Sequence, residues 1–297
     1  MYEHASVLLA EVVEAFRGVA LKTFFEGTVG AGGHAEAILA AHPEIERYLA
    51  CDRDPKAHEI AKKRLASWGE KVEWIRGSYS ELDRFLKEKK IPSIDGYLID
   101  IGVSSMQIDQ ADRGFSFRFE GPLDMRMDPE ALLTAEEIVN EYQEKELDRI
   151  FWEYGEERLS RRAAEAIAKA RKKRRIRTTT ELIEIVKPVL RWGKLHPATL
   201  IFQALRIAVN DELGELERGL DAAIERLSPG GRIAVISFHS LEDRIVKHRF
   251  KELEFKRKRG EGSLHILTKK PICPTDEESR KNPRARSAKL RVAEKVC

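Results

Sequence analysis

Cysteine is scarce in this chain. Its 297 residues include only three cysteines, Cys51, Cys273 and Cys297. Their separations match neither the paired spacing of a zinc site nor a disulfide framework. We therefore expect a protein of a reducing compartment, and the sequence predicts no metal site.

The sequence also lacks long hydrophobic runs and a large excess of charge of one sign. No stretch approaches eighteen consecutive apolar residues, and the first residues do not have the basic and apolar segments of a signal peptide. Charged residues make up 35% of the chain, but the formal net charge is only +3. We expect a cytoplasmic protein with no membrane partner, large enough for one large domain or two smaller ones.

A glycine-rich stretch near the N-terminus is the most informative part of the sequence. An apolar run from Thr23 ends at Glu26, glycines follow at positions 30, 32 and 33, and residues 35–41 have helix-forming composition. This order predicts a strand, a tight loop and a helix start, where glycine lets the backbone approach a ligand and helical N–H groups are free to bind it. The spacing is not G-x-G-x-x-G, so a simple tight turn is the alternative.

Three further apolar runs follow, and polar residues stand at their ends. The runs end at Asp52, just before Gly77–Tyr79, and at Asp100, with helix-like segments between them. In an open parallel sheet, the carboxyl ends of the strands line one crevice, and an acid after the second strand binds ribose hydroxyls. A helix N-cap is the plainer role of any single acid. Three polar strand ends behind a glycine loop favour a nucleotide-type site.

The alternation of strand and helix stops after Asp100. A fifth strand of the same type, Arg232–Ser237, appears only after more than a hundred residues, although one crossover helix normally suffices. Most of the intervening chain has helical periodicity, and Thr134–Glu137 has the form of a capping box. We expect a main domain at residues 1–107 and 199–297, closed by an antiparallel strand pair at 264–268 and 290–294. An all-helical insertion at 108–198 would recognise the substrate.

Several longer strings are more specific than this pattern. They are Gly30–His34, Asp100–Gln107, Arg113–Phe117, Gly121–Asp128, Ser237–Arg244 and Asn282–Ser287. In this order they resemble the bacterial 16S ribosomal RNA cytosine-N4 methyltransferases of the MraW family, and the resemblance runs from His4 to Lys295. It implies an α/β fold, with the mostly parallel Rossmann-like sheet of class I methyltransferases, a terminal antiparallel pair and a helical insertion.

The resemblance also implies a binding site for S-adenosyl-L-methionine. The matching positions in this chain are Gly32, Gly33, His34, Asp52, Tyr79, Asp100 and Gln107. The glycine loop with its histidine would approach the methionine part of the cofactor, and Asp52 would hold the ribose. Tyr79 would stack beside the adenine, where the family often has phenylalanine. Glu26 stands where the family more often has aspartate, so we leave it outside the predicted set.

The implied reaction is methylation of a cytidine at N4 in the decoding region of 16S ribosomal RNA. A sulfonium methyl group is already activated, so its transfer needs placement of the amine more than a strong base. Acceptors for the amine hydrogens would help, because the nitrogen lone pair is delocalised into the ring. Many amino-methyltransferases have an Asp/Asn-Pro-Pro-aromatic string after the fourth strand, whereas this chain has Asp100–Val103. Asp100 is therefore a candidate catalytic residue, and a role in cofactor binding alone is the alternative.

Three phenylalanines and a histidine are candidates for holding the target base. Phe115, Phe117 and Phe119 alternate, which would place them on one side of an extended segment. One of them would stack on an extruded cytosine; anchoring of the insertion is the alternative. His239 is a candidate for positioning the base or a phosphate, with a structural role as the alternative.

Basic residues gather in three segments despite the small net charge. The segments are 169–177, 256–259 and 280–291. A single run of this kind is usually a solvated face, but three runs in a methyltransferase fold favour contacts with RNA phosphates. The expected partner is 16S ribosomal RNA or the small ribosomal subunit, and the sequence leaves monomer and homodimer open.

Two other classes of protein compete with this interpretation. One is an RNA-binding ribosome-assembly protein that keeps the fold without catalysis, which the intact glycine loop, Asp52 and Asp100 disfavour. The other is a nicotinamide-dependent dehydrogenase, because Asp52 would also suit NAD. The imperfect glycine spacing and the basic segments disfavour that class.

Overall fold

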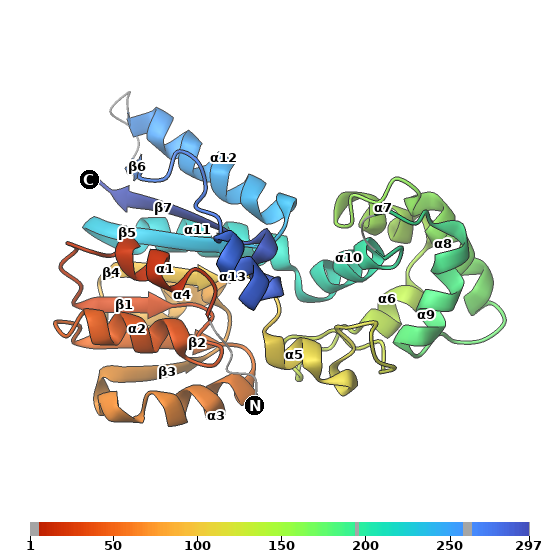
Figure 1. The fold of residues 1–297 in the computed structure, drawn as a ribbon, viewed down its shortest axis with the longest axis horizontal. Coiled ribbons are helices and arrows are strands. Elements are labelled where there is room, and N and C mark those ends of the chain that lie inside the picture. The colour runs from red at the N-terminus through yellow and green to blue at the C-terminus, as the bar shows by residue number, and fades with distance from the viewer. Residues whose placement is uncertain (1–5, 194–195, 258–262, 297) are drawn as a thin grey trace. The chain divides into compact units, whose positions relative to one another are not determined.

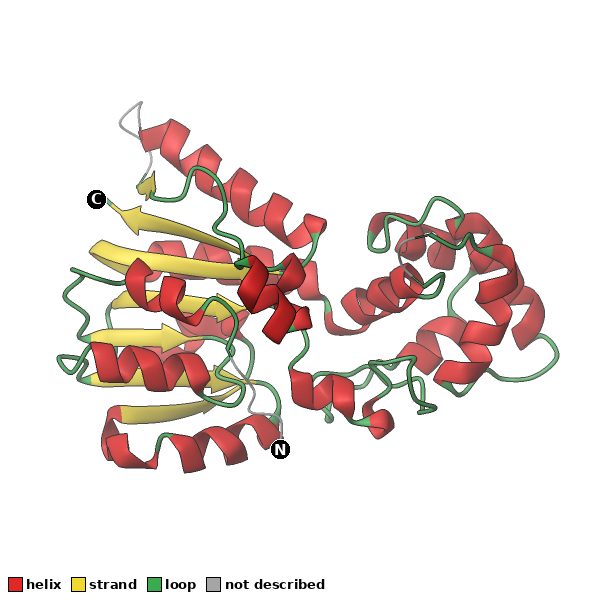
Figure 2. Ribbon diagram, in the orientation of Figure 1, coloured by secondary structure: helices red, strands yellow, loops and turns green. Residues whose placement is uncertain are grey.

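The computed structural model describes residues 6–193, 196–257 and 263–296. The chain forms two compact units, one made of Met1–Gly102 with Leu213–Cys297 and the other of Val103–Glu212. The first unit contains the β-sheet, and the second is helical (Figures 1 and 2). No helix within the described ranges is long and apolar enough to cross a membrane.

The first unit is built on a seven-stranded sheet of order β3-β2-β1-β4-β5-β7-β6. Its strands are β1 Thr23–Glu26, β2 Arg47–Asp52, β3 Val72–Arg76, β4 Ile94–Asp100, β5 Leu227–Ser237, β6 Leu264–Ile266 and β7 Lys289–Lys295. The first five strands are parallel, and β7 runs antiparallel to both β5 and β6. The predicted parallel sheet with a terminal antiparallel pair is confirmed.

Helices cover both faces of this sheet, which explains why its strands are nearly continuous apolar runs. The helices are α1 Leu9–Ala15, α2 Gly33–Ala41, α3 Pro55–Arg64, α4 Leu82–Glu88, α11 Glu212–Arg226, α12 Ser240–Arg257 and α13 Asp276–Lys281. Successive strand residues alternate between two cores. Phe24 packs with residues of α1, α2 and α3, whereas Phe25 packs with residues of α4, α11 and α12.

The second unit has its own hydrophobic core. Its helices are α5 Ser105–Asp109, α6 Ala135–Glu141, α7 Glu144–Glu153, α8 Ser160–Arg171, α9 Thr179–Val186 and α10 Thr199–Asn210. Ile138, Phe151, Ile167 and Leu205 of four different helices meet in this core. The capping box at the start of α6 is confirmed, because Thr134 Oγ1 accepts the N–H of Glu137 while Glu137 accepts the N–H of Thr134.

The second unit is longer than the insertion expected from the sequence. It spans 103–212 rather than 108–198. The largest difference is α10, which the sequence assigned to the main domain. Its residues Ile201, Leu205 and Val209 are buried in the core of the second unit. A helix belongs to the unit whose residues cover its apolar face. The sequence shows that α10 has such a face but not which unit covers it.

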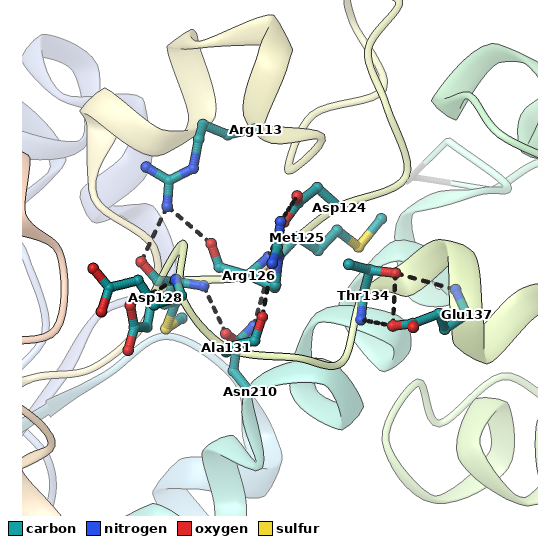
Figure 3. Close-up of polar contacts among 11 residues, drawn as sticks. Arg113, Asp124, Met125, Arg126, Asp128, Ala131, Thr134, Glu137 and Asn210 are labelled. Carbon is teal, nitrogen blue, oxygen red and sulfur yellow. Dashed lines mark hydrogen bonds and ion pairs between the residues drawn. The ribbon is translucent and has the colours of Figure 1, made fainter.

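The segment between α5 and α6 has little regular structure, and polar contacts hold it in place (Figure 3). Arg113 is buried, and its Nη2 donates to the carbonyl oxygens of Arg126 and Met127 at 2.8 and 3.0 Å. The guanidinium of Arg126 in turn donates two hydrogen bonds to the carboxylate of Asp124, at 2.9 and 2.6 Å. This ion pair holds the pKa of Asp124 below its ordinary value, even though burial alone would raise it.

Helix α10 binds the same segment through Asn210 (Figure 3). Its Oδ1 accepts the N–H of Met127 at 2.7 Å, and its Nδ2 donates to the carbonyl of Met125 at 2.8 Å. Met125 itself is fully buried in the core of the second unit. Hydrogen bonds from Arg113 and Asn210 therefore fix the backbone of residues 125–127, within the string Gly121–Asp128.

Replacing Arg113 with methionine should lower the free energy of unfolding by about 2–4 kcal/mol, because two carbonyl oxygens lose a charged donor in a buried setting. Urea unfolding of the full chain measures this change. Arg118 in the same segment is exposed, so Arg118→Met should alter stability by less than about 0.5 kcal/mol. Equal losses for the two variants would contradict the role of Arg113.

Candidate cofactor and active site

The glycine-rich stretch forms the loop between β1 and α2. Gly30 and Gly32 have positive φ angles of 51° and 79°, and Gly32 is the N-cap residue of α2. A Cβ atom at Gly33 would lie 2.1 Å from the hydroxyl oxygen of Ser6. The positive φ angles favour glycine at positions 30 and 32. The loop leads directly into the N-terminal turn of a nine-residue helix, where backbone N–H groups and the helix dipole favour polar ligands.

Asp52 lies at the end of β2 and is tied to this loop. One carboxylate oxygen accepts the N–H of Gly30 and the other accepts the N–H of Asp54, both at 2.9 Å. Burial raises the pKa of Asp52, and the two backbone hydrogen bonds oppose that rise. Because each carboxylate oxygen can accept two hydrogen bonds, both oxygens keep capacity for a further donor, such as a pair of ribose hydroxyls.

Asp100 lies at the end of β4, where the strand order reverses between β1 and β4. Its backbone N–H donates to Thr28 Oγ1 at 2.7 Å, and its Oδ2 is 4.0 Å from Nδ1 of His34. Its Oδ1 is buried and has no hydrogen-bond partner among the described residues. Burial, and next the carboxylate of Glu242, raise the pKa of Asp100 to about 7. A buried acceptor without a partner at a strand switch point favours a bound ligand.

Glu26 belongs with these acids, although it stands outside the set that the family resemblance predicts. It ends β1, is 1% exposed, and accepts the hydroxyl of Tyr48 at 2.8 Å. Its Oε1 has no hydrogen-bond partner in the described part of the chain. Burial raises the pKa of Glu26 well above its ordinary value, although the hydrogen bond from Tyr48 lowers it. The carboxylates of Asp100 and Asp52 raise this pKa further. The signal was present in the sequence, because all three acids end parallel strands.

Glu242 is a second acid that sequence reasoning missed. It lies in the first turn of α12 and is fully buried. Its Oε2 accepts the N–H groups of Phe238 and His239 at 2.7 and 3.2 Å, and its Oε1 lies 2.9 Å from Nε2 of His239. In the sequence it was only one member of a longer string. The structure gives it a role in holding the turn after β5 and in raising the pKa of Asp100.

His34 and Tyr79 occupy buried positions in the first unit. His34 lies in the first turn of α2, and its Nε2 is 2.9 Å from the carbonyl of Val7. Because a carbonyl only accepts, Nε2 carries the hydrogen, and Nδ1 faces Asp100. Tyr79 follows β3 and is 9% exposed. Gly219 of α11 packs against its ring, because a Cβ atom at Gly219 would lie only 2.5 Å from Cδ2 of Tyr79.

Gln107 lies in α5 of the second unit. Its Oε1 accepts the N–H of Ser104 at 3.0 Å, and its own N–H donates to Ser104 Oγ at 3.3 Å, which makes a capping box. The first unit thus contains Gly32, Gly33, His34, Asp52, Tyr79 and Asp100 of the predicted cofactor residues. The contact expected of Gln107 with the cofactor stays a prediction.

Two of the three phenylalanines, Phe115 and Phe117, pack against the core of the second unit. The backbone bends at residues 117–119, and Phe119 does not lie with them. The ring of Phe117 stacks on His196 at 4.8 Å and meets Phe202 edge-on at 5.2 Å. Phe119 is 56% exposed. Among the three, Phe119 is therefore the residue with an open ring that a base could contact.

The basic segment 169–177 carries less free charge than its sequence suggests. Arg174 pairs with Glu181 at 2.9 Å, and Arg175 pairs with two glutamates, Glu136 and Glu141. The exposed cations of this segment that have no ion pair among the described residues include Lys169, Lys172 and Lys173. In the second segment, Lys256 pairs with Glu252, whereas Lys258 and Arg259 lie outside the described residues.

Comparisons with known proteins agree with this geometry. A profile of the MraW methylase family matches residues 1–296. The chain is 53% identical over 309 residues to ribosomal RNA small subunit methyltransferase H of Protochlamydia amoebophila, covering 99% of this chain and 98% of the relative. It is 48% identical to the protein of the same name in Geobacter sulfurreducens, covering 99% of each. The chain belongs to the MraW methylase family.

Proposed function

We propose that this methyltransferase transfers a methyl group from S-adenosyl-L-methionine to N4 of a cytidine in the decoding region of 16S ribosomal RNA. The relatives are named for methylation of small-subunit ribosomal RNA. The observation that carries the proposal is Asp100, a half-buried carboxylate next to a glycine loop, whose Oδ1 has no hydrogen-bond partner among the described residues. An amine that must lose a proton needs such an acceptor.

The residues of the first unit fit the cofactor. The loop at Gly32 and Gly33 lets a ligand approach the backbone, and both oxygens of Asp52 keep capacity to accept ribose hydroxyls. Tyr79 presents an aromatic ring after β3 for the adenine. S-adenosyl-L-methionine supplies a methyl group on a positively charged sulfur. The acids Glu26 and Asp100 would lower the energy of positive charge bound beside them.

Asp100 has a defined part in the reaction that we propose. Its carboxylate, which is 25% exposed, accepts a hydrogen bond from the exocyclic amine of cytosine, which concentrates the lone pair on nitrogen. The carboxylate then receives the proton that nitrogen loses once it has bonded to the methyl carbon. A pKa of about 7 suits this task, because a sizeable fraction of the carboxyl is ionised at neutral pH and the ionised form is basic enough to take the proton.

Methyl transfer to ribosomal particles tests this function. Small subunits lacking the modification are incubated with the protein and labelled S-adenosyl-L-methionine, and their nucleosides are then separated. We expect labelled N4-methylcytidine in the decoding region. Cofactor binding without any labelled nucleoside would contradict the proposal and favour the non-catalytic ribosome-assembly alternative. Naked 16S ribosomal RNA, assayed in parallel, identifies the form of the substrate.

The exposed lysines of segment 169–177, which have no ion pair among the described residues, should contribute to RNA affinity. Converting Lys169, Lys172 and Lys173 to glutamine should make the dependence of log K on log salt shallower by about 2, since each phosphate contact contributes about 0.7–0.9. Binding titrations at several salt concentrations measure this slope. Arg174→Gln with Arg175→Gln is the matched control and should change the slope less, because glutamates already neutralise these two side chains. An unchanged slope in the lysine variant would contradict the contact.

A further inference from the structure

Helix α7 of the second unit presents a tryptophan to solvent. Trp152 is 56% exposed, and Lys145 and Arg149 precede it by seven and three residues, so that all three lie on the outer face of the helix. The opposite face is the buried one and includes Ile150 and Phe151. Trp152 makes no aromatic or cation–π contact with any other described residue. Its indole is therefore not needed for the core of the unit.

This tryptophan lines a pocket of about 340 Å³ between α7 and the start of α8. The pocket contains four basic side chains and one acid: Lys145, Arg149, Arg158 and Arg161, with Asp148. Asp148 accepts the hydroxyl of Ser160 at 2.6 Å, and Arg161 donates to Glu165 at 3.0 Å. Lys145, Arg149 and Arg158 are exposed and have no ion pair in the described part of the chain.

The pocket differs from the more conspicuous basic segment 169–177. There the two arginines next to the lysines are neutralised by glutamates on α6 and α9. In the Trp152 pocket, two arginines and a lysine remain available beside a flat aromatic surface. Unpaired cations close together on one surface repel each other, and their charge is compensated when an anion binds among them. An exposed aromatic ring adds a binding surface for a planar group.

We propose that the Trp152 pocket binds an unpaired stretch of RNA, with one base stacked on the indole and neighbouring phosphates on Arg149, Arg158 and Lys145. Stacking on an aromatic ring inside a basic groove is how proteins bind single strands without sequence preference. A duplex hides the faces of its bases, so the pocket should favour unpaired RNA. The proposal rests on the proposed function, because the RNA would be a part of the ribosomal substrate other than the reacting cytidine.

Binding of a fluorescently labelled oligoadenylate to the full-length protein tests the pocket. Trp152→Ala should weaken this binding about five- to hundredfold, the range measured for loss of one stacked base. Trp152→Phe should restore most of the affinity, since the ring is kept. Trp192→Ala is the matched control, because Trp192 is 65% exposed in the same unit but does not line the pocket. Equal affinities for wild type and Trp152→Ala would overturn the proposal.

Two further readouts separate stacking from charge. Intrinsic tryptophan fluorescence should fall when oligoadenylate binds, and that quenching should be lost in Trp152→Phe although the variant still binds. Arg149→Gln with Arg158→Gln should make the salt dependence shallower by about 1.4, because two contacts to a single strand are lost. Arg162→Gln, an exposed residue of α8 outside the pocket, should leave the slope unchanged. A slope that does not change in the double variant would favour an acidic protein partner and overturn the RNA assignment.

The outcome can be separated from that of the methyl-transfer assay. Oligoadenylate binding requires neither cofactor nor reaction, so Trp152-dependent binding supports the pocket even if no methylated nucleoside appears. Conversely, normal methyl transfer by Trp152→Ala with an unchanged KM for small subunits overturns the pocket and leaves the proposed reaction intact. A raised KM with an unchanged kcat supports it, because the pocket contributes to holding RNA and not to the chemical step.

Discussion

Replacing Asp100 with asparagine should reduce the rate of methyl transfer at least about 100-fold, the usual effect of losing a positioned proton acceptor. Asparagine keeps the size of the side chain and one acceptor oxygen, but it cannot take a proton. Single-turnover transfer to saturating small subunits measures the chemical step, and calorimetry with S-adenosyl-L-methionine measures cofactor affinity separately. We expect the rate to fall far more than the affinity.

The opposite pattern would contradict the catalytic role. If Asp100→Asn binds the cofactor weakly but transfers methyl groups at the normal rate once saturated, Asp100 serves cofactor binding alone. A second variant tests whether the pKa of Asp100 controls the rate. Glu242→Gln removes the negative charge that raises the pKa of Asp100, so the rise of kcat/KM with pH should shift to lower pH.

The Asp100→Asn substitution should also change the free energy of unfolding. Burial and Glu242 raise the pKa of Asp100 to about 7 in the folded protein, compared with about 3.9 in an unfolded chain. The stability that this carboxyl contributes is therefore fully present below pH 4 and is lost as the pH rises through 7. At pH 8, Asp100→Asn should be more stable than the wild type by at most about 4 kcal/mol, and below pH 4 the two should converge. Urea unfolding at both pH values, without cofactor, measures the difference.

Replacing Asp52 with alanine should weaken binding of S-adenosyl-L-methionine by about 1–3 kcal/mol. The ribose hydroxyls would lose their acceptor, and Gly30 would lose the bond that ties the glycine loop to β2. Isothermal titration calorimetry of the free enzyme measures this change directly. An unaltered affinity would remove Asp52 from the site.

The chain offers a matched control for this substitution. Asp95 Oδ2 also accepts two backbone N–H groups, from Lys22 and Thr23 at 3.0 and 2.9 Å, near the amino end of β1. Asp95→Ala should therefore destabilise the fold to a similar degree as Asp52→Ala but leave cofactor affinity unchanged. If both variants lose affinity equally, the effect of Asp52→Ala reflects a loosened sheet and not a lost ligand contact.

The fold of the first unit was predictable because its signals are local. Apolar runs of strand length, each followed by a polar residue and a helical segment, predicted the parallel strands that end at Glu26, Asp52 and Asp100. The capping box at Thr134 was equally local, since its two hydrogen bonds join residues three positions apart. The extent of the helical insertion was less predictable, because the apolar face of α10 suits either unit until its neighbours are known.

The site was predictable in its members but not in its electrostatics. The family strings pointed to Gly32 and Asp100, and the acid at the end of the second strand pointed to Asp52. The effect of Glu242 on Asp100 depends instead on residues 142 positions apart being close in space. The alternation of Phe115, Phe117 and Phe119 was misleading, because it would place the rings on one side only if the backbone were extended. A bend at residues 117–119 separates Phe119 from Phe115 and Phe117, which both pack against the core of the second unit.

By itself, the sequence determined the order of strands and helices, the acids at the strand ends and the family, because hydrophobic periodicity and residue identity are properties of the chain. The tertiary structure alone decided which charges are free. It pairs Arg174 and Arg175 with glutamates of α9 and α6, and it leaves Arg149 and Arg158 beside Trp152 without an ion pair among the described residues. The physical reason is that electrostatic energy depends on the distance between groups and on their burial, and folding sets both by bringing together residues that are far apart in the chain.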